Sequence, residues 1–197
     1  MSWKSCLMMS VGAAMMVTAT QSFAASWPTN DLVSQAAFHR CADAVTAALA
    51  NDNATEAAVA KCTKAADLAE LNSDRAAAFS NRSVLNFQRA DYNAAIADST
   101  AALKIDGRLV EAVVNRGAAY LAMHRAGEAR ADFDRALTMA PVHAEKIYFN
   151  RAMAREDMGD IKGAYADYRA ASDLNPGWDR PKQELVRFTV APAKPIS

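Results

Sequence analysis

The strongest constraint on the fold is a pair of residues that returns about once every 34 positions. An Asn-Arg pair occurs three times, at intervals of 34 and 35 residues: Asn81-Arg82, Asn115-Arg116 and Asn150-Arg151. An Ala-x-Ala-Asp motif follows each pair at the same intervals, ending at Asp98, Asp132 and Asp167. A period of about 20–50 residues is typical of chains that stack one small unit several times. The sequence therefore predicts an array of repeated units.

Each unit has the pattern of two short helices. Alanine, the strongest helix former, supplies 46 of the 197 residues, whereas glycine supplies only 7 and proline 6. A turn signal lies halfway through each unit, and a helix breaker closes it at Gly107, Pro141 and Pro176. We therefore expect an all-α fold in which every unit is an antiparallel pair of helices, each of about 13 residues.

These units resemble the tetratricopeptide repeat (TPR), from about Ala76 to Trp178. The small positions of that family, which let two helices approach closely, are filled here by Ala, Gly or Ser: Ser83, Ala95, Ala102, Gly117, Ala129, Ala136, Ala152, Ala164 and Ala171. The resemblance implies a right-handed superhelical solenoid of antiparallel helix pairs. Its three repeats would cover residues 76–109, 110–143 and 145–178.

The first 24 residues have the pattern of a secretory signal peptide. Lys4 precedes an uncharged run from Cys6 to Ala19, and Ser22-Phe23-Ala24 places small residues where a signal peptidase cleaves. A retained membrane anchor is the alternative, but the run is shorter than the ~20 residues that cross a bilayer. We expect cleavage after Ala24, export to the bacterial periplasm, and no membrane insertion after cleavage.

Two cysteines, Cys41 and Cys62, lie on either side of the turn-forming cluster Asn51-Asp52-Asn53. Their midpoint falls at this turn, so the two thiols would face each other across an antiparallel hairpin. In an exported protein such a pair is expected to form a disulfide, which closes a loop of about 22 residues and adds about 3 kcal/mol. Two small buried side chains are the alternative. Residues 28–72 then resemble a diverged repeat ahead of the other three.

Residues 179–197 follow the last repeat. A solenoid leaves one face of its terminal unit uncovered unless a capping element packs on it. We expect a short capping helix from Pro181 to Phe188, because proline suits the first turn of a helix. A flexible tail with two further prolines, Pro192 and Pro195, would end the chain.

The sequence offers no recognisable catalytic, metal or cofactor motif. It has no H-E-x-x-H, no glycine-rich phosphate loop and no G-x-S-x-G. Arg82, Arg116 and Arg151 each precede an Asp of the second motif by 16 residues, which predicts three cation–carboxylate pairs. The 22 basic residues equal the 22 acidic ones, so nothing favours nucleic-acid binding. We expect a protein that is not an enzyme and that needs no cofactor.

The resemblance also implies a concave surface lined by the first helix of each repeat. On this surface we expect apolar side chains and a row of three amides, which can donate and accept hydrogen bonds. Alternatively, each Asn bonds to the neighbouring helix. The predicted partner-binding residues are Asn81, Val84, Phe87, Val114, Asn115, Ala118, Leu121, Phe149, Asn150 and Met153.

The predicted function is that of an adaptor or scaffold that binds a partner protein or peptide in this groove. Ser80 and Val84 stand where the two-carboxylate clamp of chaperone-binding members would begin with Lys and Asn, so the sequence departs from that clamp. The alternative is a structural or assembly protein that associates with itself through its ends or its convex face.

Overall fold

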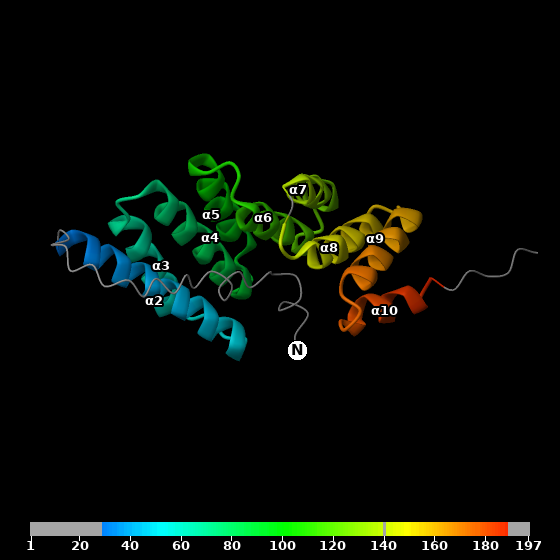
Figure 1. Cartoon of the computed structure of the whole chain (residues 1–197), viewed down its shortest axis with the longest axis horizontal. Coiled ribbons are helices and arrows are strands. Elements are labelled where there is room, and N and C mark those ends of the chain that lie inside the picture. The colour runs from blue at the N-terminus through cyan, green and yellow to red at the C-terminus, as the bar shows by residue number, and fades with distance from the viewer. Residues whose placement is uncertain (1–28, 140, 189–197) are drawn as a thin grey trace, which may run out of the picture.

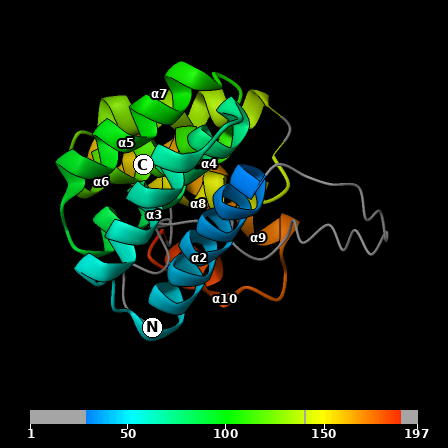
Figure 2. The same cartoon turned by 90° about the vertical axis from the view of Figure 1, so that its left-hand side faces the viewer.

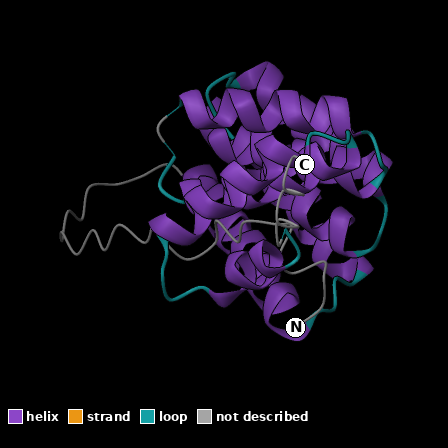
Figure 3. Ribbon diagram, turned by 90° about the vertical axis from the view of Figure 1, so that its right-hand side faces the viewer, coloured by secondary structure: helices purple, strands orange, loops and turns teal. Residues whose placement is uncertain are grey.

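A computed structural model describes residues 29–139 and 141–188, and this part of the chain contains helices and loops only (Figures 1 and 3). The helices are α2 (Thr29–Asn51), α3 (Glu56–Leu68), α4 (Asn72–Gln88), α5 (Tyr92–Ile105), α6 (Val110–Ala122), α7 (Ala126–Thr138), α8 (Ala144–Asp157), α9 (Ile161–Leu174) and α10 (Asp179–Val186). The predicted all-α array is confirmed. The predicted signal peptide and the end of the tail lie outside the described residues.

The helices stack as four pairs: α2 with α3, α4 with α5, α6 with α7, and α8 with α9. The second helix of each pair also packs on the first helix of the next pair. In addition, α2 contacts α4, α4 contacts α6 and α6 contacts α8, whereas the second helices of successive pairs make no contact of comparable extent. The first helices therefore lie on the inner, concave side of the array (Figures 1 and 2).

Small side chains allow the two helices of a pair to approach closely. Gly117 on α6 faces α7, and a Cβ atom built on it would lie 2.9 Å from Cε1 of Phe133. Ala95, Ala129 and Ala164 are each fully buried at the matching place of the second helix. The expected close packing through small side chains is therefore present.

An arginine fastens the two helices of each of the last three pairs. Arg82, Arg116 and Arg151 each donate two hydrogen bonds of 2.6–2.9 Å to the predicted carboxylates, which are Asp98, Asp132 and Asp167 respectively. This bidentate arrangement is the strong form of the Arg–carboxylate pair. The hydrogen bond to Asp98 raises the pKa of Arg82, and desolvation opposes it only in part.

The same arginines also reach the preceding pair. Their Nη1 atoms donate to Thr63 Oγ1 at 2.9 Å, to Thr100 Oγ1 at 3.5 Å and to Asp134 Oδ1 at 2.7 Å. These acceptors lie at equivalent places on α3, α5 and α7. Each arginine thus joins three helices, and we call this arrangement the arginine clip. The sequence showed the pairing within each repeat but not this link between units.

The α2–α3 hairpin is fastened differently. The predicted disulfide joins Cys41 to Cys62, with a Cα–Cα separation of 4.5 Å, and both cysteines are fully buried. Two residues before the clip acceptor, where the later pairs have an Asp, α3 has Lys61. The ion pair is therefore missing from this hairpin, and the covalent bond occupies the neighbouring place.

The last helix, α10, begins at Asp179, two residues before the predicted start at Pro181. Trp178 is the residue that precedes its first turn. It packs on α9. Tyr168 and Phe188 lie 5.9 Å apart between ring centroids, and Phe149 and Trp178 lie 4.9 Å apart. This aromatic cluster joins α10 to the last repeat and covers the end of the array, as expected for a cap.

Candidate functional site

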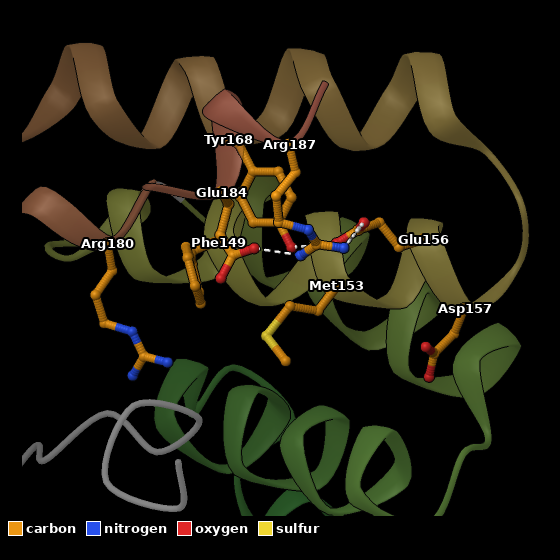
Figure 4. A pocket seen from close by; sticks show the side chains of 8 residues that line it. All are labelled: Phe149, Met153, Glu156, Asp157, Tyr168, Arg180, Glu184 and Arg187. Carbon is orange, nitrogen blue, oxygen red and sulfur yellow. Dashed lines mark hydrogen bonds and ion pairs between the residues drawn. The ribbon is translucent and has the colours of Figure 1, made fainter. Parts of the chain in front are cut away.

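A pocket of about 330 Å³ opens where α10 meets the concave side of the last repeat (Figure 4). Four of its lining residues come from α8, one from α9, two from α10 and one from the residue that follows α10: Phe149, Met153, Glu156, Asp157, Tyr168, Arg180, Glu184 and Arg187. The α8 residues are spaced along one side of the helix. The pocket is therefore built by the inner face of the third repeat together with the cap.

The floor of the pocket is aromatic. Phe149 and Tyr168 are each 1% exposed, and their rings meet edge to face with centroids 5.3 Å apart. Such pairs add about 0.5–1.5 kcal/mol beyond the area they bury. Met153 is partly exposed and supplies a flexible apolar wall. The floor is thus rigid, and Met153 can adapt to an apolar group.

One side of the pocket is a closed network of charges. Glu156 accepts hydrogen bonds from the Tyr168 hydroxyl at 2.6 Å and from Arg187 Nη2 at 3.0 Å, and Glu184 pairs with Arg187. Burial, reinforced by the hydrogen bond to Glu156, raises the pKa of Tyr168 well above its usual range. These groups hold α10 on α8 and α9, so they shape the pocket rather than offer charges to a ligand.

Two charged groups stand outside this network. The Arg180 guanidinium lies 5.6 Å from the centre of the Phe149 ring and forms no ion pair with a described carboxylate. At the opposite end of the pocket (Figure 4), Asp157 lies 3.6 Å from Nδ1 of His124, which is largely exposed. The pocket therefore offers a cation at one end, a carboxylate at the other, and an apolar stretch at Met153 between them.

The structure brings two of the ten predicted partner-binding residues, Phe149 and Met153, into this pocket. Phe87 packs edge to face on Tyr92 at 5.2 Å. Eight of the ten are buried in this structure: Val84, Phe87, Val114, Asn115, Ala118, Leu121, Phe149 and Asn150. The expectation that all ten are open on the concave surface is corrected for these eight. Asn81 and Met153 keep part of their surface exposed, and the binding role of the set stays a prediction.

Asn115, the middle one of the three predicted amides, bonds to the neighbouring helix. This favours the alternative that these amides hold helices together over the alternative that they face a partner. The Nδ2 atom of Asn115 lies 3.4 Å from Oγ and 3.5 Å from the carbonyl oxygen of Ser80, on the neighbouring helix α4. These are long hydrogen bonds, so each is weak. Asn115 therefore helps to set the register of α6 against α4.

Six lining residues were not among the predicted site residues. Arg180 and Glu184 lie on α10 and Arg187 is the residue that follows it, and their spacing of four and three residues places them on one face of this helix and its last turn. That spacing was a usable signal for a charged face on the capping helix. Glu156 and Asp157 lie at the end of α8, where only the packing of α10 shows that they line a pocket. From the sequence alone, Tyr168 is expected to be a buried residue of the helix pair, and nothing indicates that it lines a pocket.

No helix among the described residues combines the length and the apolar character that a membrane span requires. No group of three or more His, Cys, Asp or Glu side chains in residues 29–139 and 141–188 is arranged as a metal site.

Comparisons with known proteins support this architecture. A family model described as "Tetratricopeptide repeat" matches residues 145–177. The TPR domain of Arabidopsis OM64 is 26% identical, with a TM-score of 0.57, over 59% of this chain and 96% of that domain. The second TPR domain of human RPAP3, solved in complex with the HSP70 peptide SGPTIEEVD, is 25% identical, with a TM-score of 0.57, over 61% of this chain and all of that domain.

A third solved structure shares the fold alone. MamA is 17% identical, with a TM-score of 0.58, over 81% of this chain and 79% of MamA. No curated protein sequence is significantly similar to the chain. TPR domains commonly bind proteins or peptides and are generally not enzymes. Residues 145–177 therefore form a tetratricopeptide repeat, and the described part of the chain has the solenoid fold of the solved TPR domains.

Proposed function

We propose that the protein is a non-enzymatic adaptor that binds an extended segment of a partner protein on its concave side, anchored in the pocket between α8 and α10. The observation that carries this proposal is the pocket itself, because it places an unpaired cation, an apolar wall and a carboxylate along one opening. Apolar anchors flanked by a few polar groups are typical of peptide-binding sites.

The chemistry of the pocket suggests what the partner segment contains. Arg180 would receive an acidic side chain, because its guanidinium is accessible and has no carboxylate of its own. Met153 would contact an apolar side chain next to it. The RPAP3 domain, 25% identical to this chain, was solved with an acidic peptide, which supports peptide binding as a class. Since Ser80 and Val84 depart from the carboxylate clamp, we do not extend that particular peptide to this chain.

The proposal is tested by capturing partners from the cell envelope with the wild-type protein and with the double variant Arg180→Ala/Met153→Ser. We expect the variant to lose the proteins that the wild type enriches, as measured by crosslinking and quantitative mass spectrometry. Arg169→Ala/Met158→Ser is the matched control, because both side chains are exposed outside the pocket. If the Arg180→Ala/Met153→Ser variant captures the same proteins in the same amounts as the wild type, the pocket is not the partner-binding site.

Export to the periplasm is part of the same proposal and rests on the sequence of residues 1–24. We expect the mature protein to begin at Ala25 and to be found in the periplasmic fraction. N-terminal sequencing of protein purified from the native cell measures both the cleavage and its position. An intact Met1 in a cytoplasmic fraction would contradict this part of the proposal, and it would leave the pocket experiment unaffected.

A further inference from the structure

The open end of the array, formed by α2 and α3, has an exposed apolar strip. Leu32 is 60% exposed and Val33 is 53% exposed, both on the first turns of α2, and Leu68 at the end of α3 is also exposed. Figure 2 shows α2 as the foremost labelled helix at this end of the molecule. Large apolar side chains grouped in this way are typical of a contact surface.

Two shallow hollows of about 340 and 360 Å³ meet at Val33. The first lies between α2 and α3, and its rim carries three exposed cations, Arg40, Lys61 and Lys64. The second lies at the end of α3 and is bordered by two exposed acids, Asp67 and Glu70. None of these five charged residues forms an ion pair within the described part of the chain. We call the two hollows and the strip together the hairpin surface.

The charges on the hairpin surface are separated by sign, with the cations around one hollow and the acids around the other. Lys61 and Lys64 come first along α3, Asp67 follows near the end of this helix and Glu70 lies just beyond it. Val33 lines both the hollow with the lysines and the hollow with the acids. An acidic partner or an anionic membrane would satisfy the cations but would meet Asp67 and Glu70 with the same sign of charge. A second copy of the same hairpin, turned by a two-fold rotation, would place its acids against the lysines and its lysines against the acids.

We propose that the hairpin surface is a two-fold dimerisation surface, in which Leu32, Val33 and Leu68 of two copies pack together and the lysine and acid pairs match across the axis. A two-fold interface requires a surface that is complementary to itself, and the order of charges around Val33 meets this requirement. The disulfide Cys41–Cys62 holds α2 against α3 and so keeps the two halves of the surface in register. This proposal is independent of the pocket at the other end of the array.

The test uses two charge-reversal variants and their mixture, examined by sedimentation equilibrium with the disulfide intact. Wild-type protein is expected to dimerise. Lys61→Glu/Lys64→Glu and Asp67→Lys/Glu70→Lys are each expected to weaken self-association at least about tenfold, because every contact across the axis becomes repulsive. An equimolar mixture of the two variants is expected to form a heterodimer as tightly as the wild type, because the reversed charges match again.

Matched controls separate this surface from general effects of charge and exposure. Lys104→Glu/Lys162→Glu changes the net charge equally at exposed sites elsewhere, and it should leave the dimer unchanged. Leu32→Ser/Val33→Ser should weaken the dimer at least about tenfold, whereas Val142→Ser/Leu174→Ser, at exposed apolar positions elsewhere, should not. Circular dichroism checks that each variant keeps its helices.

Four results would overturn the proposal. The first is a wild-type protein that stays monomeric at every concentration tested. The second is a dimer that survives both charge reversals, which would place the interface elsewhere. The third is a mixture of the two reversed variants that fails to associate. Binding of monomeric wild type to phosphatidylglycerol vesicles, lost in Lys61→Glu/Lys64→Glu, would instead assign the surface to an anionic lipid and would also overturn dimerisation.

Discussion

The α2–α3 hairpin and the three repeats that follow are all antiparallel helix pairs, but different interactions hold the two helices of each pair together. In the repeats, Arg82, Arg116 and Arg151 join the two helices of a pair and the helix before them. In the hairpin, the disulfide Cys41–Cys62 fastens the pair, and Lys61 occupies the place of the paired Asp. The position of each unit in the array explains this difference.

An arginine clip needs an acceptor on the preceding unit. The hairpin has no described helix pair before it, so an arginine there would lose one of its three attachments. A disulfide requires no residue outside the hairpin, because Cys41 lies on α2 and Cys62 lies on α3. The terminal unit also buries less surface than an internal one, so a covalent fastening compensates where neighbours are missing on one side.

At the other end of the array, the last repeat has no acceptor for a further arginine clip. At the place on α9 that matches the clip acceptors Thr63, Thr100 and Asp134, the chain has Arg169, which is exposed and lies near Asp173. A cation at this place would repel the arginine of a further repeat. The helix that follows, α10, carries no clip and instead packs through aromatic rings. The clip thus runs through the three repeats and stops at α9.

The largest expected effect comes from breaking the clip of the third repeat. Only 4% of the Asp167 side chain is exposed, and it pairs with both Arg151 and Arg155. The substitution Asp167→Ala leaves two half-buried guanidinium groups without this partner. Asp134 still pairs with Arg151, and Asp160 lies 3.7 Å from Arg155, but both of these carboxylates are more exposed than Asp167 and compensate the two cations only in part. We therefore expect a loss of about 3–4 kcal/mol in the free energy of unfolding. Urea denaturation measures the loss.

The matched control for this change is Asp173→Ala on the same helix. Asp173 also pairs with an arginine, Arg169, but both side chains are about 70% exposed and their charged atoms are 3.8 Å apart. Surface pairs of this kind contribute about 0.5 kcal/mol or less. A similar loss for both variants would mean that the clip adds nothing beyond an ordinary surface pair.

The second prediction concerns the covalent fastening. The double variant Cys41→Ala/Cys62→Ala should lose about 3 kcal/mol, because the unfolded chain regains the entropy of a loop of about 22 residues. The loss should be local. Hydrogen exchange should speed up in α2 and α3 and change little in α6 to α9. Uniformly faster exchange would show that the hairpin and the repeats unfold as one unit, and that the disulfide does not stabilise the hairpin separately.

The third prediction tests the close approach of helices within a repeat. Gly117→Ala places a methyl group within 3.0 Å of the Phe133 ring. We expect a net loss of about 2 kcal/mol, since overpacking exceeds the gain in helix propensity. Gly127→Ala is the control, because a Cβ atom there meets nothing within 4 Å, and it should be neutral or slightly stabilising. Thermal unfolding of both variants measures the difference, and equal melting temperatures would refute the packing argument.

The sequence predicted the repeated architecture well because its signals are local. The small residues and the Arg82–Asp98 spacing depend on positions within one unit, and the Asn-Arg period repeats that unit along the chain. The structure confirms the helix pairs and the pairing of these charges. Glu156 and Arg187, by contrast, lie 31 residues apart and meet only through the packing of α10. No period brings them together in sequence, so the pocket could not be predicted.

The groove residues show a second limit. Val114 and Leu121 repeat at helical spacing, and this pattern is the same for a face that points into a core and for a face that lines a groove. Sequence periodicity therefore identifies the apolar face of α6 but not what covers it. Burial of both side chains is a property of how neighbouring elements pack, which a pattern within one helix does not contain.

The smallest expected effect concerns the fastening of α10, which uses neither a clip nor a disulfide. Tyr168→Phe removes the hydrogen bond to Glu156 and should cost about 1 kcal/mol at neutral pH. Its dependence on pH is more informative. The pKa of the Tyr168 hydroxyl is raised by burial and by Glu156, so the folded state holds this proton more tightly than the unfolded state. The contribution is therefore complete below the unfolded pKa of about 10 and is lost as the pH rises above it.

We accordingly expect the wild type to lose stability more steeply than Tyr168→Phe above pH 10, so that the gap between the two proteins narrows and then reverses. Denaturant midpoints measured from pH 7 to pH 11.5 give this comparison. Tyr165→Phe is the control, because Tyr165 lies on the same helix with an exposed side chain, and it should not change the slope. Parallel curves for wild type and Tyr168→Phe would mean that the hydroxyl ionises equally in both states, and that α10 is held by its aromatic contacts and by Arg187 alone.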